Sequence, residues 1–394
     1  MRHAAFAVLF AVGSLAQAAP LERFYVASVS ITEFGTLGGA NSAAFDINNY
    51  GIIVGWAQDE FAIRRAAMFG SATTPTNIGL AYASRSSEAR GINNWNQVVG
   101  FYTAGTTNHA FRWSGSWTVS LPDYAPGFES PPGSEARAIA DTGLMAGVRS
   151  FKTTLPSGGY FLHWTNATTW PDEYSFNTIA SRYAWSSRIN DVNPAGNMFV
   201  GHDKVSGLDA VRWQEAGGDY TEHQVPEPAA FGDFLYTIGD ALGINNAGAV
   251  VGYAWRTHRP PGLPQVTTTR AYYWNGHSAE SQDLGTFPSG NNSEAEDINS
   301  EYFIAGFGDV VIPLFGTYSV IRNAGFLHHS DFGIYRLPLP AGMLSGNCRA
   351  TALNNRKANG LIQIAGTCDT ATGTRAVRWD VTVGRRSTLP PPSF

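Results

Sequence analysis

A short phrase repeats seven times along this chain and limits its possible folds more than any other feature. An apolar residue, usually followed by Asn, leads through a tight turn into an apolar run that ends in Gly, as from Ile47 to Gly55. Consecutive copies lie 45 to 60 residues apart, counted between the closing glycines Gly55, Gly100, Gly147, Gly201, Gly252, Gly306 and Gly366. This spacing is the length of one supersecondary unit rather than of a domain. The chain is therefore expected to fold as an array of repeats.

Each copy has the pattern of four short strands. In the second copy, residues 87–92 and 108–113 alternate between apolar and polar, residues 97–102 are β-branched and apolar, and residues 117–121 follow a Ser-Gly-Ser turn. A lone four-stranded sheet cannot bury both faces, whereas seven sheets packed radially cover one another. We therefore predict an all-β fold, a seven-bladed β-propeller of four-stranded antiparallel blades, with repeats that begin near 42, 87, 134, 187, 240, 293 and 348.

The two ends of the chain suggest export and ring closure. Residues 1–19 combine a positive charge, an apolar run and a small-residue site, which predicts a secretory signal and a secreted or periplasmic protein. No later run approaches the roughly 18 apolar residues of a membrane span. The remaining 20–394 are expected to form a single domain in which residues 20–41 add an outer strand to the last blade. Residues 386–389 compete for that place, so a fifth strand in the last blade is an alternative.

The two cysteines of the chain are predicted to form one disulfide. In the first copy, a four-residue turn would pair Ile47 with Ile52 and therefore Ser42 with Ala57. Cys348 and Cys368 occupy the matching positions of the seventh copy. Directly opposed cross-strand positions lie roughly 4.5–5.5 Å apart, within reach of a disulfide.

The repeat phrase resembles that of the HAF-type extracellular repeat family. The resemblance is carried by GTLGGANSAAFDINNYGIIVG at 35–55 and by the pattern INNAGAVVGYA…YYW…DLGT from 244 to 286, and it extends over the whole chain after the signal. Copies three, six and seven depart from the pattern, with Ala140 in place of Asn, no aromatic pair at 326–329 and an insertion at 356–359. The resemblance implies an extracellular repeat protein, and neither a reaction nor a ligand comes with it.

The two faces of such a propeller differ in their loops. The Asn of each turn accepts left-handed backbone angles and bonds its own turn amides, so we interpret the face with these turns as plain scaffold. The loops of the opposite face vary, and binding sites usually lie in such loops. Their aromatic and charged residues suit stacking on sugar rings and bonding of sugar hydroxyls. The ligand-binding candidates there are Trp56, Tyr102, Asp203, Tyr253, Trp255, Arg256 and Asp309; capping of blade ends is the alternative for Trp56 and Trp255.

A second group of candidates lies on the innermost strands. The sequence Ser-Glu-Ala-Arg occurs at 87–90 and 134–137, and Ser-Glu-Ala-Glu at 293–296, so charges recur near the mouth of the expected channel. We interpret them as a structural Glu/Arg network between blades, because unpaired buried charges are costly. In the alternative they line a pocket in which Arg90 and Arg137 bind ligand. The catalytic candidates are then Glu88, Glu135, Glu294, His202 and His258.

Composition and motifs narrow the function without identifying a ligand. The formal net charge of −5 disfavours nucleic acid as a partner. No nucleophile elbow, HExxH pattern, Walker loop or dinucleotide motif is present. Asp59, Asp203 and Asp309 leave calcium open, but no ligand-spaced metal motif occurs, so neither metal nor cofactor is assigned.

The leading hypothesis is a monomeric exported propeller that binds a polysaccharide or another envelope component through its variable loops. A carbohydrate-active hydrolase or lyase and a protein-interaction scaffold are the alternatives.

Overall fold

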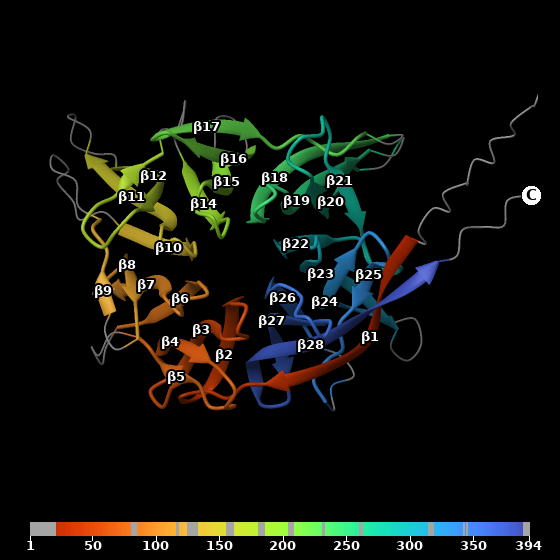
Figure 1. Ribbon diagram of the computed structural model, residues 1–394, viewed down its shortest axis with the longest axis horizontal. Coiled ribbons are helices and arrows are strands. Elements are labelled where there is room, and N and C mark those ends of the chain that lie inside the picture. The colour runs from red at the N-terminus through yellow and green to blue at the C-terminus, as the bar shows by residue number, and fades with distance from the viewer. Residues whose placement is uncertain are drawn as a thin grey trace, which may run out of the picture.

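The computed structural model describes residues 21–388 except for 80–84, 116–117, 124–132, 155–160, 180–185, 204–208, 231–232, 260–261, 263, 314–318, 342 and 344–345. These residues form 28 strands in seven four-stranded antiparallel sheets, arranged around a central axis (Figure 1). No helix occurs in the described part of the chain. The predicted seven-bladed propeller is therefore confirmed.

Each blade runs outward from its first-named strand, which lines the axis (Figure 1). Blade 1 contains β2 (Gly38–Ile47), β3 (Ile53–Asp59), β4 (Arg64–Phe69) and β5 (Thr76–Asn77). Blade 2 contains β6 (Ser87–Ile92), β7 (Val98–Ala104), β8 (Thr107–Trp113) and β9 (Thr118–Ser120). Blade 3 contains β10 (Gly133–Ile139), β11 (Met145–Thr154), β12 (Phe161–Trp170) and β13 (Asn177–Thr178).

The remaining blades follow in the same order around the axis. Blade 4 contains β14 (Ser187–Val192), β15 (Met198–Asp203), β16 (Asp209–Ala216) and β17 (Asp219–Gln224). Blade 5 contains β18 (Phe234–Ile244), β19 (Val250–His258), β20 (Val266–Trp274) and β21 (Gln282–Gly285). Blade 6 contains β22 (Ser293–Ile298), β23 (Ile304–Pro313), β24 (Ser319–His329) and β25 (Gly333–Arg336). Blade 7 contains β26 (Cys348–Leu353), β27 (Leu361–Thr370), β28 (Gly373–Thr388) and β1 (Leu21–Glu33).

The N-terminal strand closes the ring, as predicted. β1 pairs antiparallel with β28 from Leu21 opposite Thr388 to Glu33 opposite Val377, and both long strands cross the lower right of Figure 1. The alternative of a fifth strand is wrong, because β28 continues without interruption to Thr388 as the third strand and leaves one outer edge for β1. Leu389 and the predicted signal segment 1–19 lie outside the described residues. Among the described residues, no helix is long and apolar enough to cross a membrane.

Every innermost strand carries a β-bulge at one equivalent position. The pairing of each first strand with the second skips one residue. The predicted pairing of Ile47 with Ile52 is wrong, because the turn is one residue longer and Ile47 faces Ile53. The bulge then restores the register, so Ser42 faces Ala57 as expected. The bulged residues are Phe45, Arg90, Arg137, Asn190, Leu242, Glu296 and Thr351.

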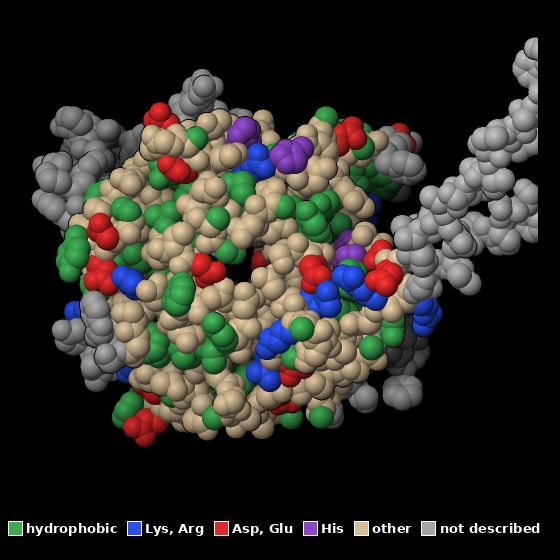
Figure 2. All heavy atoms as spheres, viewed as in Figure 1, with side chains coloured by type: hydrophobic (Ala, Val, Ile, Leu, Met, Phe, Trp, Pro, Cys, Tyr) green, Lys and Arg blue, Asp and Glu red, His purple; other side chains and the backbone are tan. Residues whose placement is uncertain are grey.

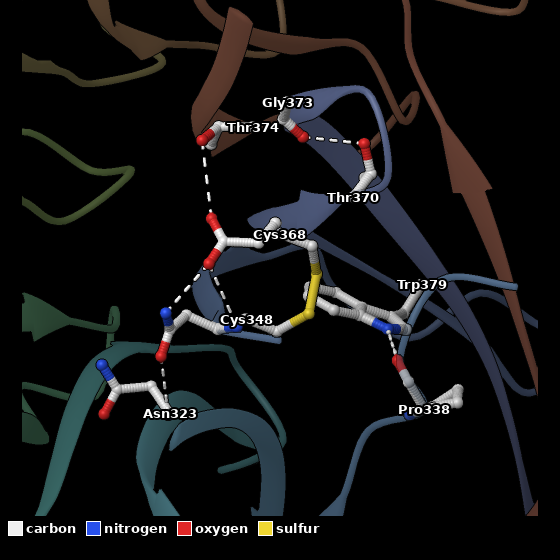
Figure 3. The surroundings of a disulfide bond; sticks show 10 residues. Asn323, Pro338, Cys348, Cys368, Thr370, Gly373, Thr374 and Trp379 are labelled. Carbon is white, nitrogen blue, oxygen red and sulfur yellow. Dashed lines mark hydrogen bonds between the residues drawn. A yellow bond between two sulfur atoms is a disulfide. The ribbon is translucent and has the colours of Figure 1, made fainter. Parts of the chain in front are cut away.

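The same register places the two cysteines opposite each other, and the predicted disulfide is present. Cys348 in β26 pairs with Cys368 in β27, with Cα atoms 4.1 Å apart. The bond lies beside Trp379, whose indole nitrogen donates to the Pro338 carbonyl (Figure 3). The two cysteines and Trp379 belong to the core between blades 6 and 7.

The turn asparagines link the blades into a belt. As predicted, each side-chain oxygen accepts from amides of its own turn, for example from Tyr50 and Ile52 at Asn48. The side-chain nitrogens do something that the sequence pattern did not indicate, since they donate to a carbonyl of the next blade. The donors are Asn48, Asn93, Asn245, Asn299 and Asn354, and the last of them returns to blade 1.

Candidate functional site

The bulges direct one side chain per blade into the axial channel. All seven bulged residues line a cavity of about 190 Å³ on the axis, and we call them the bulge ring. A second set of equivalent residues lies two positions before the bulged residue of each innermost strand, and therefore nearer the variable loops. We call this set the entrance set. Its members are Ala43, Glu88, Glu135, Arg188, Asp240, Glu294 and Arg349. The predicted charged residues of the channel mouth therefore belong to two stacked rings.

A larger cavity of about 410 Å³ opens among blades 2, 3 and 4 on the side of the variable loops. We call it the loop-face cavity. Its charged and titratable lining consists of Glu135, Arg137, Arg188 and His202, and Asn108 and several hydroxyl groups complete the wall. Arg137 also lines the channel cavity, so the two spaces meet at its side chain.

Ion pairs hold the charged side chains of blades 2 and 3. Glu88 accepts from Arg64 at 2.9 Å and from Arg90 at 2.7 Å. Glu135 accepts from the Asn108 amide at 2.9 Å and, more weakly, from Arg137 at 3.3 Å. Because Arg64 and Asn108 belong to the preceding blades, these bonds form the expected network between blades. Glu135 and Arg137 also line the loop-face cavity, whereas Arg90 lines the channel cavity.

An ion pair between Asp240 and Arg188 was not expected from the sequence. Asp240 is buried and lies 2.7 Å from the Arg188 guanidinium and 3.4 Å from the His202 ring. Burial alone would raise the pKa of Asp240, but its bonds with His202 and Arg188 hold that pKa below its usual range. Neither blade 4 nor blade 5 has the Ser-Glu-Ala signature in its innermost strand. Alignment of the seven copies on their bulge positions would have found Arg188 and Asp240.

Several predicted ligand-binding aromatics are less exposed than expected. The exposed position expected for Trp56 is wrong, because its residue is 8% exposed and the Arg64 guanidinium covers its ring at 4.4 Å. This is the arrangement expected of a blade cap. Tyr102 stacks on His109, with ring centroids 5.4 Å apart, and Tyr253 and Trp255 pack edge to face at 5.8 Å. These last three side chains are half-buried.

The remaining candidates have packing or hydrogen-bonding partners outside the loop-face cavity. Arg256 and His258 both pack on Phe234, at 4.5 Å in each case. The expectation that Asp203 and Asp309 lie in loops is wrong, because both are buried residues of the strands β15 and β23. Asp309 accepts from both backbone amides of residues 291–292 and from the Asn292 side chain, and so shapes that turn. Burial raises the pKa of Glu294, which faces Arg349 rather than either histidine.

The face with the uniform turns also carries exposed aromatic side chains. Tyr50, Trp95 and Tyr302 project there with exposed fractions of 69%, 72% and 42%. All the predicted aromatic ligand-binding residues belong to the opposite face, so none of these three was expected from the sequence. Figure 2 shows the propeller along its axis, with an opening at the centre of the visible face.

Half-buried carboxyl groups line the channel below the bulge ring. Asp46, Asp191 and Asp297 each accept from the next residue's amide and from an amide of the following blade. Burial raises the pKa of Asp46 to about 7 and that of Asp297 to about 6. Burial and the nearby Glu294 raise the pKa of Glu296 to about 8. Among the described residues, no group of three or more His, Cys, Asp or Glu has the geometry of a metal site.

Comparisons with known proteins add only distant likenesses in fold. No family model matches the chain, and no curated protein is similar to it in sequence. The β-propeller domain of the Trilobed protease from Pyrococcus furiosus aligns over 76% of this chain and 84% of its own, with 10% identity and a TM-score of 0.45. A gluconolactonase from Xanthomonas campestris aligns over 92% and 95%, with 9% identity and a TM-score of 0.38. Polysaccharide lyase Uly1 aligns over 92% and 99%, with 9% identity and a TM-score of 0.41.

Proposed function

We propose that this protein is an exported binding propeller of the HAF-type repeat family, and that its loop-face cavity holds a saccharide unit of a polysaccharide or another envelope component. The observation that carries the proposal is the cavity itself. Its volume of about 410 Å³ falls in the range of small-molecule sites, roughly 300–1,000 Å³. It lies among three blades, and the innermost strands of blades 3 and 4 contribute Glu135, Arg137 and Arg188 to its walls.

The chemistry of the lining suits sugar hydroxyls, which both donate and accept hydrogen bonds. Asn108 supplies an amide, Thr107 and Thr165 supply hydroxyls, and Glu135 and Arg188 supply a charged acceptor and a charged donor. Strand residues and ion pairs hold several of these groups in place before any ligand arrives. Such preorganisation lowers the entropic cost of binding.

The proposed export agrees with two further features. Residues 1–19 have the pattern of a secretory signal, and the Cys348–Cys368 bond suits an oxidising compartment.

A polysaccharide array tests this function. The purified protein is applied to immobilised plant, algal, fungal and bacterial polysaccharides, and both retained protein and released products are measured. We expect retention on a restricted set of polymers without product release. Retention on none of them would contradict a saccharide-binding function.

A second candidate function, cleavage of the bound polysaccharide, is favoured by one observation. Glu135 and His202 line the same cavity, and Asp240 contacts Nδ1 of His202, which leaves Nε2 to exchange a proton. The array separates the two functions. Product release that His202→Gln abolishes while retention persists would establish cleavage, whereas retention without product would exclude it for the polymers tested.

A further inference from the structure

We propose that the saccharide bound in the loop-face cavity carries an oxyanion, a carboxylate or a sulfate, and that Arg137 binds this group between Arg90 and Arg188. The inference rests on the proposed function and specifies the chemical class of its ligand.

The fold brings these three arginines together from consecutive blades. Arg90 and Arg137 are the bulge-ring residues of blades 2 and 3, and Arg188 belongs to the entrance set of blade 4. Arg137 lies between the other two and lines both the channel and the loop-face cavity. A ligand in the cavity therefore has direct access to its guanidinium.

The electrostatics of the cluster favour an added negative charge. Burial, followed by the like charges of Arg188 and Arg90, lowers the pKa of Arg137 to about 10. Around these residues, the four arginines Arg64, Arg90, Arg137 and Arg188 face the three carboxylates Glu88, Glu135 and Asp240. Within these ion pairs the arginines outnumber the carboxylates by one. The other carboxyl groups near Arg90 and Arg137 are those of the channel, Asp46, Asp191, Glu296 and Asp297, and burial raises the pKa of each of them.

Hydrogen-bond donors of the cluster are also unused. The only side-chain hydrogen bond of Arg137 within the described structure is the 3.3 Å contact with Glu135. The Nε atoms of Arg90 and Arg188 are buried and have no acceptor among the described residues. Buried donors normally have acceptors, and a planar carboxylate or a sulfate accepts several guanidinium bonds at once.

The charge of the whole molecule disfavours a ligand as densely charged as nucleic acid. The formal net charge is −5, so a polyanion approaching from a distance is repelled on average. Recognition must instead arise inside the cavity, where hydroxyl and amide groups surround the arginines. This combination fits single acidic groups spaced along a sugar chain.

The test uses calorimetric titration with three oligosaccharides that share one backbone and length: neutral, carboxylated at C6, and sulfated. We expect one or both acidic forms to bind at least about tenfold more tightly than the neutral form, as expected for charge-assisted hydrogen bonds. Arg137→Gln should remove this preference. Arg349→Gln, which changes an exposed arginine of the entrance set in blade 7, should keep it. The two acidic forms distinguish carboxylate from sulfate as the source of the oxyanion.

The outcomes separate this inference from the proposed function. Equal binding of neutral and acidic forms, or a preference that survives Arg137→Gln, would overturn the inference and leave saccharide binding intact. Binding of none of the three would count against both. Should Arg137→Gln fail to fold, thermal unfolding of the wild-type protein with glucuronate or with glucose gives the answer. The melting temperature should rise only with glucuronate, and an equal rise with glucose would overturn the inference.

Discussion

Glu296 of the bulge ring has a carboxyl group whose surroundings favour its protonated, neutral form. Its side chain faces the channel among half-buried carboxyl groups, and burial and the nearby Glu294 raise its pKa to about 8. The same carboxyl group in the unfolded chain titrates near 4.5. The folded state therefore binds a proton that the unfolded state releases between these two pH values. The stability that this protonated group contributes is complete below pH 4.5 and is lost as the pH rises through about 8.

We predict that Glu296→Gln flattens the pH dependence of stability. Glutamine keeps the shape of the protonated acid and does not ionise, so at pH 9 the variant should have a free energy of unfolding about 1–3 kcal/mol higher than wild type. The two proteins should differ little near pH 4. Urea titrations at both pH values measure the difference, with the exposed Glu227→Gln as a control. An unchanged pH dependence would show that Glu296 is ionised in the fold.

At the scale of the strand, one serine position joins neighbouring blades. Its hydroxyl oxygen, at the start of the innermost strand, accepts from an alanine amide in the third strand of the preceding blade. Ser42, Ser87, Ser134, Ser187 and Ser293 all make this bond. In blade 7 the equivalent residue is Cys348, which bonds to Cys368 of the same blade, so the serine hydroxyl is missing at the interface with blade 6.

Because Cys348 stands where other blades have serine, we predict that two double variants without the disulfide differ in stability. Loss of the bond, whose cysteines are 20 residues apart, should lower the free energy of unfolding by on the order of 3 kcal/mol. Cys348→Ser with Cys368→Ala restores the serine acceptor, so it should be about 1 kcal/mol more stable than Cys348→Ala with Cys368→Ala. Denaturant unfolding of both double variants measures the difference between their free energies of unfolding. Equal stabilities would mean that no bond between blades forms at this position.

At the scale of the whole molecule, closure depends on the pairing of the two chain ends. Phe24 of β1 packs edge to face on Phe303 of blade 6 at 5.1 Å, and its amide donates to Asp331. Arg356 and Arg385 both lie over its ring and pair with Glu301. β1 therefore bonds to blade 7 through its backbone and contacts blade 6 through its side chains.

A circular permutant tests this closure. Because Leu21 faces Thr388, a two-residue Asn-Gly turn can join them as a hairpin. New ends between Gly217 and Gly218, an exposed turn in which both residues have positive φ, leave every blade intact. We expect the permutant to keep the wild-type circular dichroism spectrum and to melt at or above the wild-type temperature. A melting temperature well below that of wild type would indicate that β1 and β28 do not end side by side in solution.

The repeating parts of this structure could be predicted from the sequence. Periodic turns and glycines predicted the blades, the closing strand and the cysteine pair. The bulges were not predictable from one copy, because a bulge and a longer turn shift the register by opposite amounts and leave Ser42 opposite Ala57. Of the charged and titratable residues that line the cavity, the sequence indicated Glu135 and Arg137, where neighbouring copies share a signature, and His202, which follows the apolar run of copy four. Arg188 and Asp240 meet across two blades that lack the signature, and only the folded ring brings them together.

Saccharide binding in the loop-face cavity is best tested by filling that cavity with a bulky side chain. Thr106 lines the cavity from the β7–β8 turn, and Thr372 has the equivalent place in the β27–β28 turn of blade 7. The affinity of an oligosaccharide from a retained polymer is measured for Thr106→Trp and Thr372→Trp. We predict that Thr106→Trp weakens binding by at least about tenfold, because the indole ring takes the space of the ligand. The control variant Thr372→Trp should bind as tightly as wild type. Wild-type affinity in Thr106→Trp would contradict saccharide binding in this cavity.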